Sequence, residues 1–238
     1  MSELSADASR GLREALGVSA VVTFAVAASG MFLPPAWHTT AVALIFFGAG
    51  WLLVWRGDDD AVRRAGVSLG GLVIPGPLAL PDVLRAAATA LAWAAGLLLL
   101  IAVPVFYAWR LWWAPKLSFS LGQHPLDYET ELLAQVLIIA LPEEAFYRGY
   151  LQSKLDEAWE PRWNVLGASL GPGFFVTAAI FALGHLATVP VPARLAVFFP
   201  ALVFGWLRAR TGGIGASTAL HAGCNVYSLL LGRGYGLY

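Results

Sequence analysis

The stretch from Leu132 to Leu151, LLAQVLIIALPEEAFYRGYL, combines an apolar run with two adjacent acids and an arginine. About 20 largely apolar residues are enough to cross the hydrocarbon core of a bilayer as a helix. Ionisable side chains at that depth cost free energy, so they usually carry function. The stretch therefore predicts a membrane-spanning helix that holds functional residues.

The composition of the whole chain also indicates a membrane protein. Of 238 residues, 58% are hydrophobic and 13% are charged, against roughly 45–50% and about 25% in soluble domains. The mean hydropathy is +0.68. Seven apolar runs are candidate spans: Gly17–Leu33, Thr39–Trp55, Ala86–Trp109, Leu132–Leu151, Leu170–Val189, Leu195–Leu207 and Ile214–Leu231. We expect one all-α transmembrane domain over residues 1–238, a polytopic helical bundle of seven or eight transmembrane helices.

An eighth span is an alternative for residues 66–80, where the chain is apolar. Pro75 and Pro77 interrupt this run and Pro81 follows it. Irregular backbone at membrane depth is tolerated where it is buried in protein or lines a wet cavity. A re-entrant or interfacial segment is therefore an equally good interpretation.

Lysine and arginine are distributed unequally between the two sides that seven spans would define. With a cytoplasmic N-terminus, the inside set is Arg10, Arg13, Arg56, Arg63, Arg64, Arg85, Lys154, Arg162, Arg208 and Arg210. The outside set is Arg110, Lys116, Arg194 and Arg233. Basic residues favour the cytoplasmic side. The sequence thus predicts a multi-pass protein with its N-terminus inside, and its Ala-, Gly- and Arg-rich composition suggests a bacterial cytoplasmic membrane.

Charge and cysteine content exclude several other classes of protein. The net charge is zero, whereas nucleic-acid binding needs an excess of basic residues to neutralise phosphates. Cys224 is the only cysteine, so neither an intrachain disulfide nor a cysteine-based zinc site can form. The expected partners are the lipid bilayer and a membrane-anchored substrate, and the oligomeric state is left open.

The acids of the central stretch have different neighbours if it is helical. Glu144 and Arg148 are four residues apart and share a face, so they can form an ion pair. Glu143 points about 100° away from Glu144. Glu143 is then free to hold and deprotonate a water molecule, a role that burial favours by raising the pKa of a carboxyl group. Pro142 lacks a backbone donor, so we expect the helix to kink or begin there.

Two further polar groups lie in later apolar runs, at His185 and at the pair His221 and Asn225. Each group alone has a structural explanation. A single histidine near a span end is commonly interfacial, and a polar pair four apart often makes hydrogen bonds between helices. The acidic pair with its arginine could likewise be a buried ion cluster that fixes helix packing. Their occurrence together on three separate runs favours a hydrolytic site.

The motif set resembles the CPBP family of intramembrane endopeptidases, also called the Abi or type II CAAX prenyl protease family. It consists of Glu143-Glu144-x-x-x-Arg148, Phe181-x-x-x-His185 and His221-x-x-x-Asn225, and residues 143–151 read EEAFYRGYL. The similarity covers about residues 130–232. The resemblance implies that Glu143 activates water and that His185 holds this water or shuttles its proton. It also implies that Glu144 and Arg148 orient the site, while His221 and Asn225 donate hydrogen bonds to the oxyanion.

The cofactor requirement stays open at the level of sequence. Two histidines and a glutamate are a zinc-hydrolase ligand set, and the family has been described both as metalloproteases and as glutamate proteases. No His-Glu-x-x-His motif occurs here, a pattern that would place two ligands on one helix face. We favour a metal-free glutamate endopeptidase, with zinc or another divalent metal as the alternative.

The substrate class follows only from the resemblance. Relatives trim prenylated C-termini, or process peptides, bacteriocin precursors and C-terminal sorting tails. We favour cleavage near the C-terminus or membrane anchor of a membrane-associated protein or peptide, with a myxosortase-type sorting protease as one specific possibility. The alternatives are a noncatalytic membrane scaffold and a small proton-coupled transporter, which can also place ionisable groups at mid-membrane.

Overall fold

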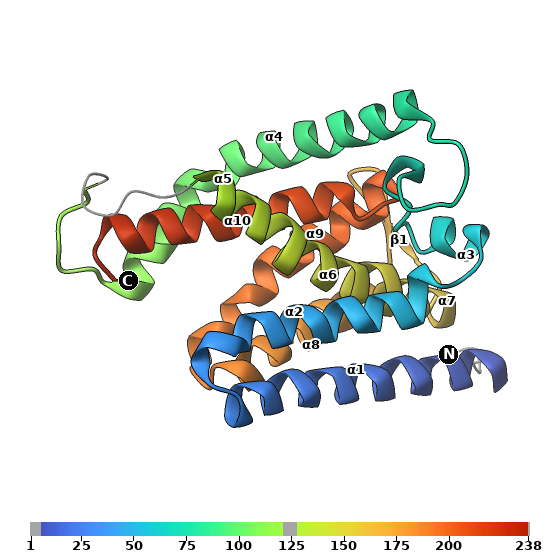
Figure 1. Cartoon of the computed structure of the whole chain (residues 1–238), viewed down its shortest axis with the longest axis horizontal. Helices are drawn as coiled ribbons and strands as arrows, with labels where there is room; N and C mark the ends of the chain where they lie inside the picture. Colours follow the sequence, from blue (N-terminus) through green and yellow to red (C-terminus); the bar gives the residue numbers. More distant parts are fainter. Residues whose placement is uncertain (1–5, 121–127, 238) are drawn as a thin grey trace.

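The structure is a computed structural model that describes residues 6–120 and 128–237. Each of the seven predicted runs falls largely in its own helical segment, and the segments lie side by side in one bundle (Figure 1). The run predicted from Leu170 starts too early, because Leu170 ends a β-strand and the helix begins at Pro172. The first three segments are α1 (Ala6–Phe32), α2 (Pro35–Gly50), which continues as the π-helical turn η1 (Trp51–Trp55), and α4 (Leu80–Trp113).

The fourth segment is a continuous helical stretch whose hydrogen-bonding pattern changes four times. Its parts are α5 (Tyr128–Leu133), the π-helix η3 (Ala134–Ala140), α6 (Leu141–Glu144), the π-helix η4 (Ala145–Gln152) and α7 (Ser153–Ala158). Runs of π-helix are rare and are frequently found at functional sites. The candidate residues of the central stretch therefore lie where the backbone departs most from regular α-helix.

The C-terminal segments complete the bundle. They are α8 (Pro172–Thr188), the 3₁₀ turn η5 (Pro192–Val197) leading into α9 (Phe198–Thr211), and α10 (Gly215–Gly234). A short hairpin precedes α8, in which β1 (Trp163–Val165) pairs antiparallel with β2 (Ala168–Leu170). Figure 1 places α1 along one flank and α4 along the opposite flank, with α10, α9 and the fourth segment between them. The hairpin was not predicted from the sequence.

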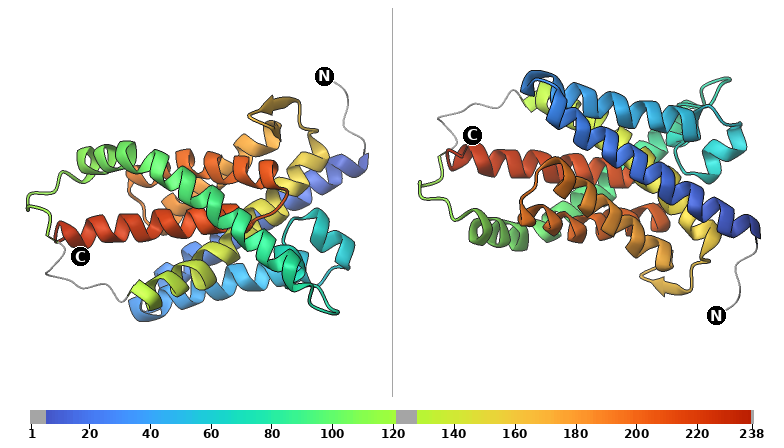
Figure 2. Two further views of the ribbon diagram at one scale, coloured as in Figure 1. Left: turned by 90° about the horizontal axis from the view of Figure 1, so that it is seen from above. Right: turned by 90° about the horizontal axis from the view of Figure 1, so that it is seen from below.

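Loops gather at the two ends of the bundle. The N-terminal end of α1, the α3 loop and the β hairpin lie at one end, and the C-terminus lies at the other (Figure 2). The helix α3 (Asp59–Arg64) begins at Asp58, whose side chain accepts a hydrogen bond from the backbone N–H of Ala61 at 2.7 Å. Such a side-chain oxygen satisfies a donor that the first helical turn leaves free.

The structure confirms the expected all-α membrane bundle. Four of the described helices are long and apolar enough to cross a membrane: Asp7–Phe32, Pro35–Trp55, Leu80–Trp113 and Pro192–Thr211. The segment Pro172–Thr188 is a shorter apolar helix. The predicted total of seven or eight spans, and the single domain over residues 1–238, stay predictions. Within the predicted run 66–80, residues 66–79 form turns around the short helix η2 (Leu69–Gly71) rather than a long helix, and Leu80 begins α4.

The first loop packs directly against the fourth segment. A Cβ atom on Gly149 would lie 2.5 Å from Cγ1 of Val67, a fully buried residue. Any larger side chain would push the loop away, so glycine is required next to Arg148. The main apolar core, which includes Phe46, Phe146 and Phe181, surrounds the same region. The candidate residues of the fourth segment are thus surrounded by the main apolar core.

Candidate active site

Glu144 and Arg148 form a fully buried ion pair, as their four-residue spacing predicts. Arg148 Nη1 donates to Glu144 Oε1 at 2.9 Å, and neither side chain is exposed to solvent. Arg148 Nη2 also donates to the backbone carbonyl of Ala201 in α9 at 3.0 Å. Ion pairs buried in this way need further hydrogen bonds to offset the loss of hydration. The arginine therefore both neutralises the acid and joins η4 to α9.

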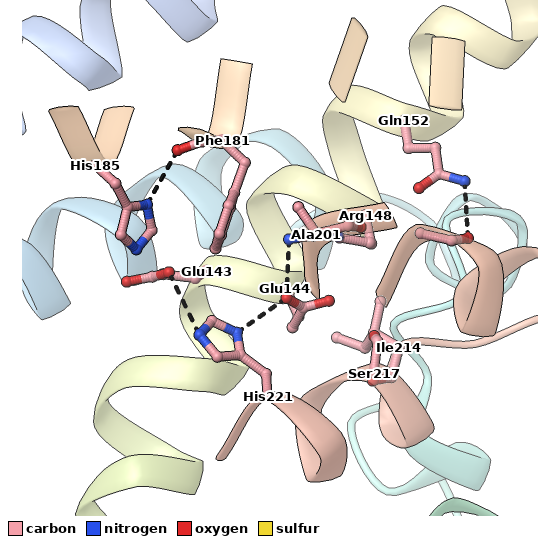
Figure 3. Close-up of polar contacts among 11 residues, drawn as sticks. Glu143, Glu144, Arg148, Gln152, Phe181, His185, Ala201, Ile214, Ser217 and His221 are labelled. Carbon is pink, nitrogen blue, oxygen red and sulfur yellow. Dashed lines mark hydrogen bonds and ion pairs between the residues drawn. The ribbon is translucent and has the colours of Figure 1, made fainter. Parts of the chain in front are cut away.

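His221 on α10 lies between the two adjacent acids (Figure 3). Its Nδ1 is 3.0 Å from Glu144 Oε1, and its Nε2 is 3.9 Å from Glu143 Oε2. The ring stacks on Phe204 with 4.9 Å between centroids and 16° between planes. Because an ionised carboxylate can only accept, the first contact places a proton on Nδ1. The opposite nitrogen then faces Glu143 at a distance too long for a direct hydrogen bond.

Glu143 and His185 line a common cavity of about 170 Å³. The carboxylate of Glu143 points toward the His185 ring in Figure 3. His185 Nδ1 is 3.0 Å from the backbone carbonyl of Phe181, one turn earlier on α8. A carbonyl can only accept, so Nδ1 is the donor and Nε2 keeps its lone pair in the neutral ring. The two adjacent acids consequently differ in environment, since only Glu143 lines this cavity.

The expected break at Pro142 takes a different form. The backbone stays helical through Pro142, which lies in the first turn of the four-residue α6 between two π-helical stretches. A proline within a helix removes a backbone donor and crowds the preceding turn. Widened π turns on either side are one way for a helix to accommodate such a disruption. The acids are therefore displayed from a distorted but continuous helix, not from a helix start.

Asn225 lies one turn beyond His221 on α10 and has a partner that the sequence did not suggest. Its Nδ2 donates to Oε1 of Gln135 in η3 at 2.9 Å. An asparagine amide carries two N–H donors, so one remains after this bond is made. The structure thus brings five candidate residues into one connected region. The sixth, Asn225, lies one turn away from His221 and is hydrogen-bonded to Gln135. The catalytic role of each residue stays a prediction.

Several neighbouring residues were missed by sequence reasoning. Gln135 was detectable as the one polar residue in the run from Leu132 to Leu141. Phe181 and Phe204 flank the ion pair, with Arg148 Cζ lying 4.6 and 5.3 Å from their ring centroids. His38 at the start of α2 lines the cavity with Glu143. No pattern in the sequence could place α2 next to the motif residues.

A metal site would need several donor side chains that converge on one point. In the part of the chain that the structure describes, no group of three His, Cys, Asp or Glu side chains is arranged to hold a metal ion. Glu143, His185 and His221 are the donors that would have to converge on one. The metal-free prediction made from the sequence stays a prediction.

Comparison with known proteins finds a family match for the region that contains these residues. Residues 127–227 match the family described as type II CAAX prenyl endopeptidase Rce1-like. Residues 127–227 are called the Rce1-like region below. No curated protein and no solved structure matches the chain. The Rce1-like region supports, at a general level, a CAAX-type intramembrane protease that acts on membrane-associated proteins.

All six candidate residues lie inside the Rce1-like region, whereas α1, α2 and α4 lie outside it. The apolar helices and the family together support an integral membrane protein. The resemblance inferred from the three motifs is confirmed.

Proposed function

We propose that this protein is an intramembrane endopeptidase that hydrolyses a peptide bond near the C-terminus or membrane anchor of a membrane-associated protein or peptide. The observation that carries the proposal is the different environment of two adjacent acids. Glu144 is fully buried and bound to Arg148 and His221, while Glu143 lines a cavity with His185. In this arrangement one carboxylate can orient the site while the other is free to act as a general base.

Glu143 would be the general base in this reaction. A water molecule between Glu143 and His185 can donate one proton to the carboxylate and the other to the Nε2 lone pair. The bond from His185 Nδ1 to the Phe181 carbonyl keeps that lone pair available. Transfer of one water proton to Glu143 gives a hydroxide that attacks the peptide carbonyl. Glu143 can then return the proton to the amine that leaves, so the enzyme ends in its starting state.

His221 would respond to the charge that develops on the substrate oxygen. Its Nδ1 is bound to the Glu144 carboxylate, which fixes the orientation of the ring. A protonated His221 can donate from Nε2, the nitrogen that faces Glu143. The free N–H of Asn225 is the second candidate donor. Fixed donors at a developing oxyanion each contribute a rate factor of about 10²–10³.

The proposed mechanism uses no metal. Each step above is assigned to a side chain of the protein itself. A divalent ion held by Glu143 and the two histidines is the competing arrangement. The two mechanisms differ in an outcome that can be measured directly, namely the response of activity to tight chelators.

The test is cleavage of membrane-anchored reporter peptides, prenylated and unprenylated, by purified full-length protein in liposomes. Glu143→Gln is compared with the native protein, and Glu157→Gln is the matched control because Glu157 lies on the surface in a pair with Lys154. We expect Glu143→Gln to lose about 10²–10⁴-fold in activity. The control and the chelator-treated native protein should stay fully active.

Three outcomes would count against the proposal. Normal cleavage by the Glu143→Gln variant would remove Glu143 as the base. Loss of native activity on chelation, with recovery when zinc is added back, would replace the metal-free mechanism. Failure of correctly folded native protein to cleave any reporter would favour the noncatalytic scaffold or the transporter.

A further inference from the structure

The two ends of the bundle differ in charge. The ten residues of the inside set lie at the end formed by the start of α1, the α3 loop, the β hairpin and the end of α9 (Figures 1 and 2). Contacts between loops hold this basic end together, since Ile214 N donates to the Gly66 carbonyl at 2.9 Å. The four residues of the outside set lie at the other end, where Ser120 N donates to the Gly234 carbonyl at 2.8 Å. The two sets of basic residues predicted from the sequence thus lie at opposite ends of the bundle.

The catalytic cavity lies in the half of the bundle away from the basic end. Its wall includes His38 and Thr39 near the start of α2, and Thr188 at the last position of α8. These residues adjoin the α1–α2 and α8–η5 connections, which are both at the end that carries few basic residues. Thr39 is exposed and provides a hydrophilic rim. The cavity therefore faces the end of the outside set.

Access from the basic end is blocked. A second cavity, of about 340 Å³, reaches inward there and is lined by Arg64, Gln152, Asp156 and Arg208. It ends at Arg148, and neither Glu143 nor His185 lines it. Arg148 and its partner Glu144 are fully buried, and Glu144 lines neither cavity. Water or substrate in the second cavity would have to displace the ion pair to reach Glu143.

From these relationships we infer that the substrate enters the catalytic cavity from the non-cytoplasmic side of the membrane. Basic residues mark the cytoplasmic end of a membrane protein, and the cavity opens at the opposite end. What this direction of entry implies for the substrate rests on the proposed peptidase function. The substrate is then a membrane-anchored peptide whose cleaved bond lies in the outer half of the bilayer after export, rather than a lipidated C-terminus in the cytoplasm.

Cysteine accessibility tests the direction of opening without requiring activity. The only cysteine, Cys224, is replaced by serine. Thr39→Cys then reports on the cavity rim, and Glu160→Cys reports on an exposed position at the basic end. Spheroplasts that express the full chain are treated with a membrane-impermeant maleimide before and after permeabilisation. The native chain, whose only cysteine is Cys224, shows how much labelling Cys224 itself gives. If the Cys224→Ser variant fails to accumulate, the two new cysteines are introduced into the native chain and this labelling is subtracted.

We expect the Thr39→Cys variant to react in intact spheroplasts and the Glu160→Cys variant to react only after permeabilisation. The reverse pattern would overturn the inference, as would a Thr39→Cys variant that never reacts. A second arm uses reporters whose cleavable bond is exported or cytoplasmic, and cleavage of the cytoplasmic reporter alone would also overturn it. Absence of all cleavage together with the expected labelling would instead count only against the peptidase function.

Discussion

Nδ1 of His221 lies 3.0 Å from Oε1 of Glu144, although 77 positions separate the two residues in the chain. The same oxygen accepts from Arg148 at 2.9 Å. A single carboxylate oxygen therefore joins α10 to the fourth segment and fixes the tautomer of the histidine. Substitution of Glu144 should therefore affect both the stability of the fold and the orientation of the His221 ring.

Glu144→Gln should destabilise the protein by about 3–5 kcal/mol, because Arg148 is left as a buried charge without a counter-charge. Adding Arg148→Met to Glu144→Leu should give a more stable protein than Glu144→Gln, since no charge then remains buried. Thermal unfolding in detergent measures both effects. Lys154→Met, which breaks an exposed pair with Glu157, is the control and should change stability by under about 1 kcal/mol. A Glu144→Gln variant as stable as this control would contradict the importance of the buried pair.

Asn225→Ala should lower kcat by up to about 10²–10³-fold if its free N–H stabilises the oxyanion. Gln135→Ala should cost less, because it removes only the acceptor that orients the asparagine. In the Asn225→Ala background, Gln135→Ala should have no further effect on kcat. The double-mutant cycle is measured by steady-state kinetics on a reporter peptide. Additive losses would show that the two side chains act separately.

His38→Ala should raise KM about 3- to 10-fold with little change in kcat, which is the effect of losing one hydrogen bond to bound substrate. The reason is that His38 lines the cavity and its buried Nε2 has no hydrogen-bond partner among the described residues. His38→Gln should recover part of the affinity. Thr40→Val changes an exposed neighbour that does not line the cavity and serves as the control. An unchanged KM in the His38→Ala variant would exclude substrate contact.

Asp156 should make stability depend on pH in the acid range. It follows the fourth predicted span, and burial raises its pKa from 3.8 to about 6, although Arg208 and Gln152 act in the opposite direction. Because the folded pKa exceeds the unfolded one, the folded state binds the proton more tightly. This contribution to stability is complete below about pH 4 and is lost as pH rises through about 6.

Asp156→Asn should remove this part of the pH dependence, since an amide does not titrate. The measurement is the Tm of native and variant proteins in detergent at several values between about pH 4 and 7.5. The native Tm should fall relative to that of the variant as pH rises. Parallel curves would show that Asp156 is not shielded from water in the second cavity.

The sequence by itself determined the local relationships. Seven apolar runs predicted seven helical segments, because backbone polar groups in lipid have to be satisfied within the segment. The spacing of Glu144 and Arg148 predicted their ion pair, because residues four apart share one helix face. The order of the three motifs was enough to indicate the Rce1-like family. The first two inferences needed only a pattern within a short stretch, and the third needed three short motifs in order along the chain.

Only the tertiary structure decided which residues meet across helices. The partners of His221 and Asn225, namely Glu144 and Gln135, lie 77 and 90 positions away, and no spacing rule acts over such separations. Half of the cavity wall comes from α1 and α2, which carry no motif. The direction in which the cavity opens follows from where helix ends gather, a property of packing. Local periodicity fixes the helices, whereas side-chain complementarity between them fixes the site.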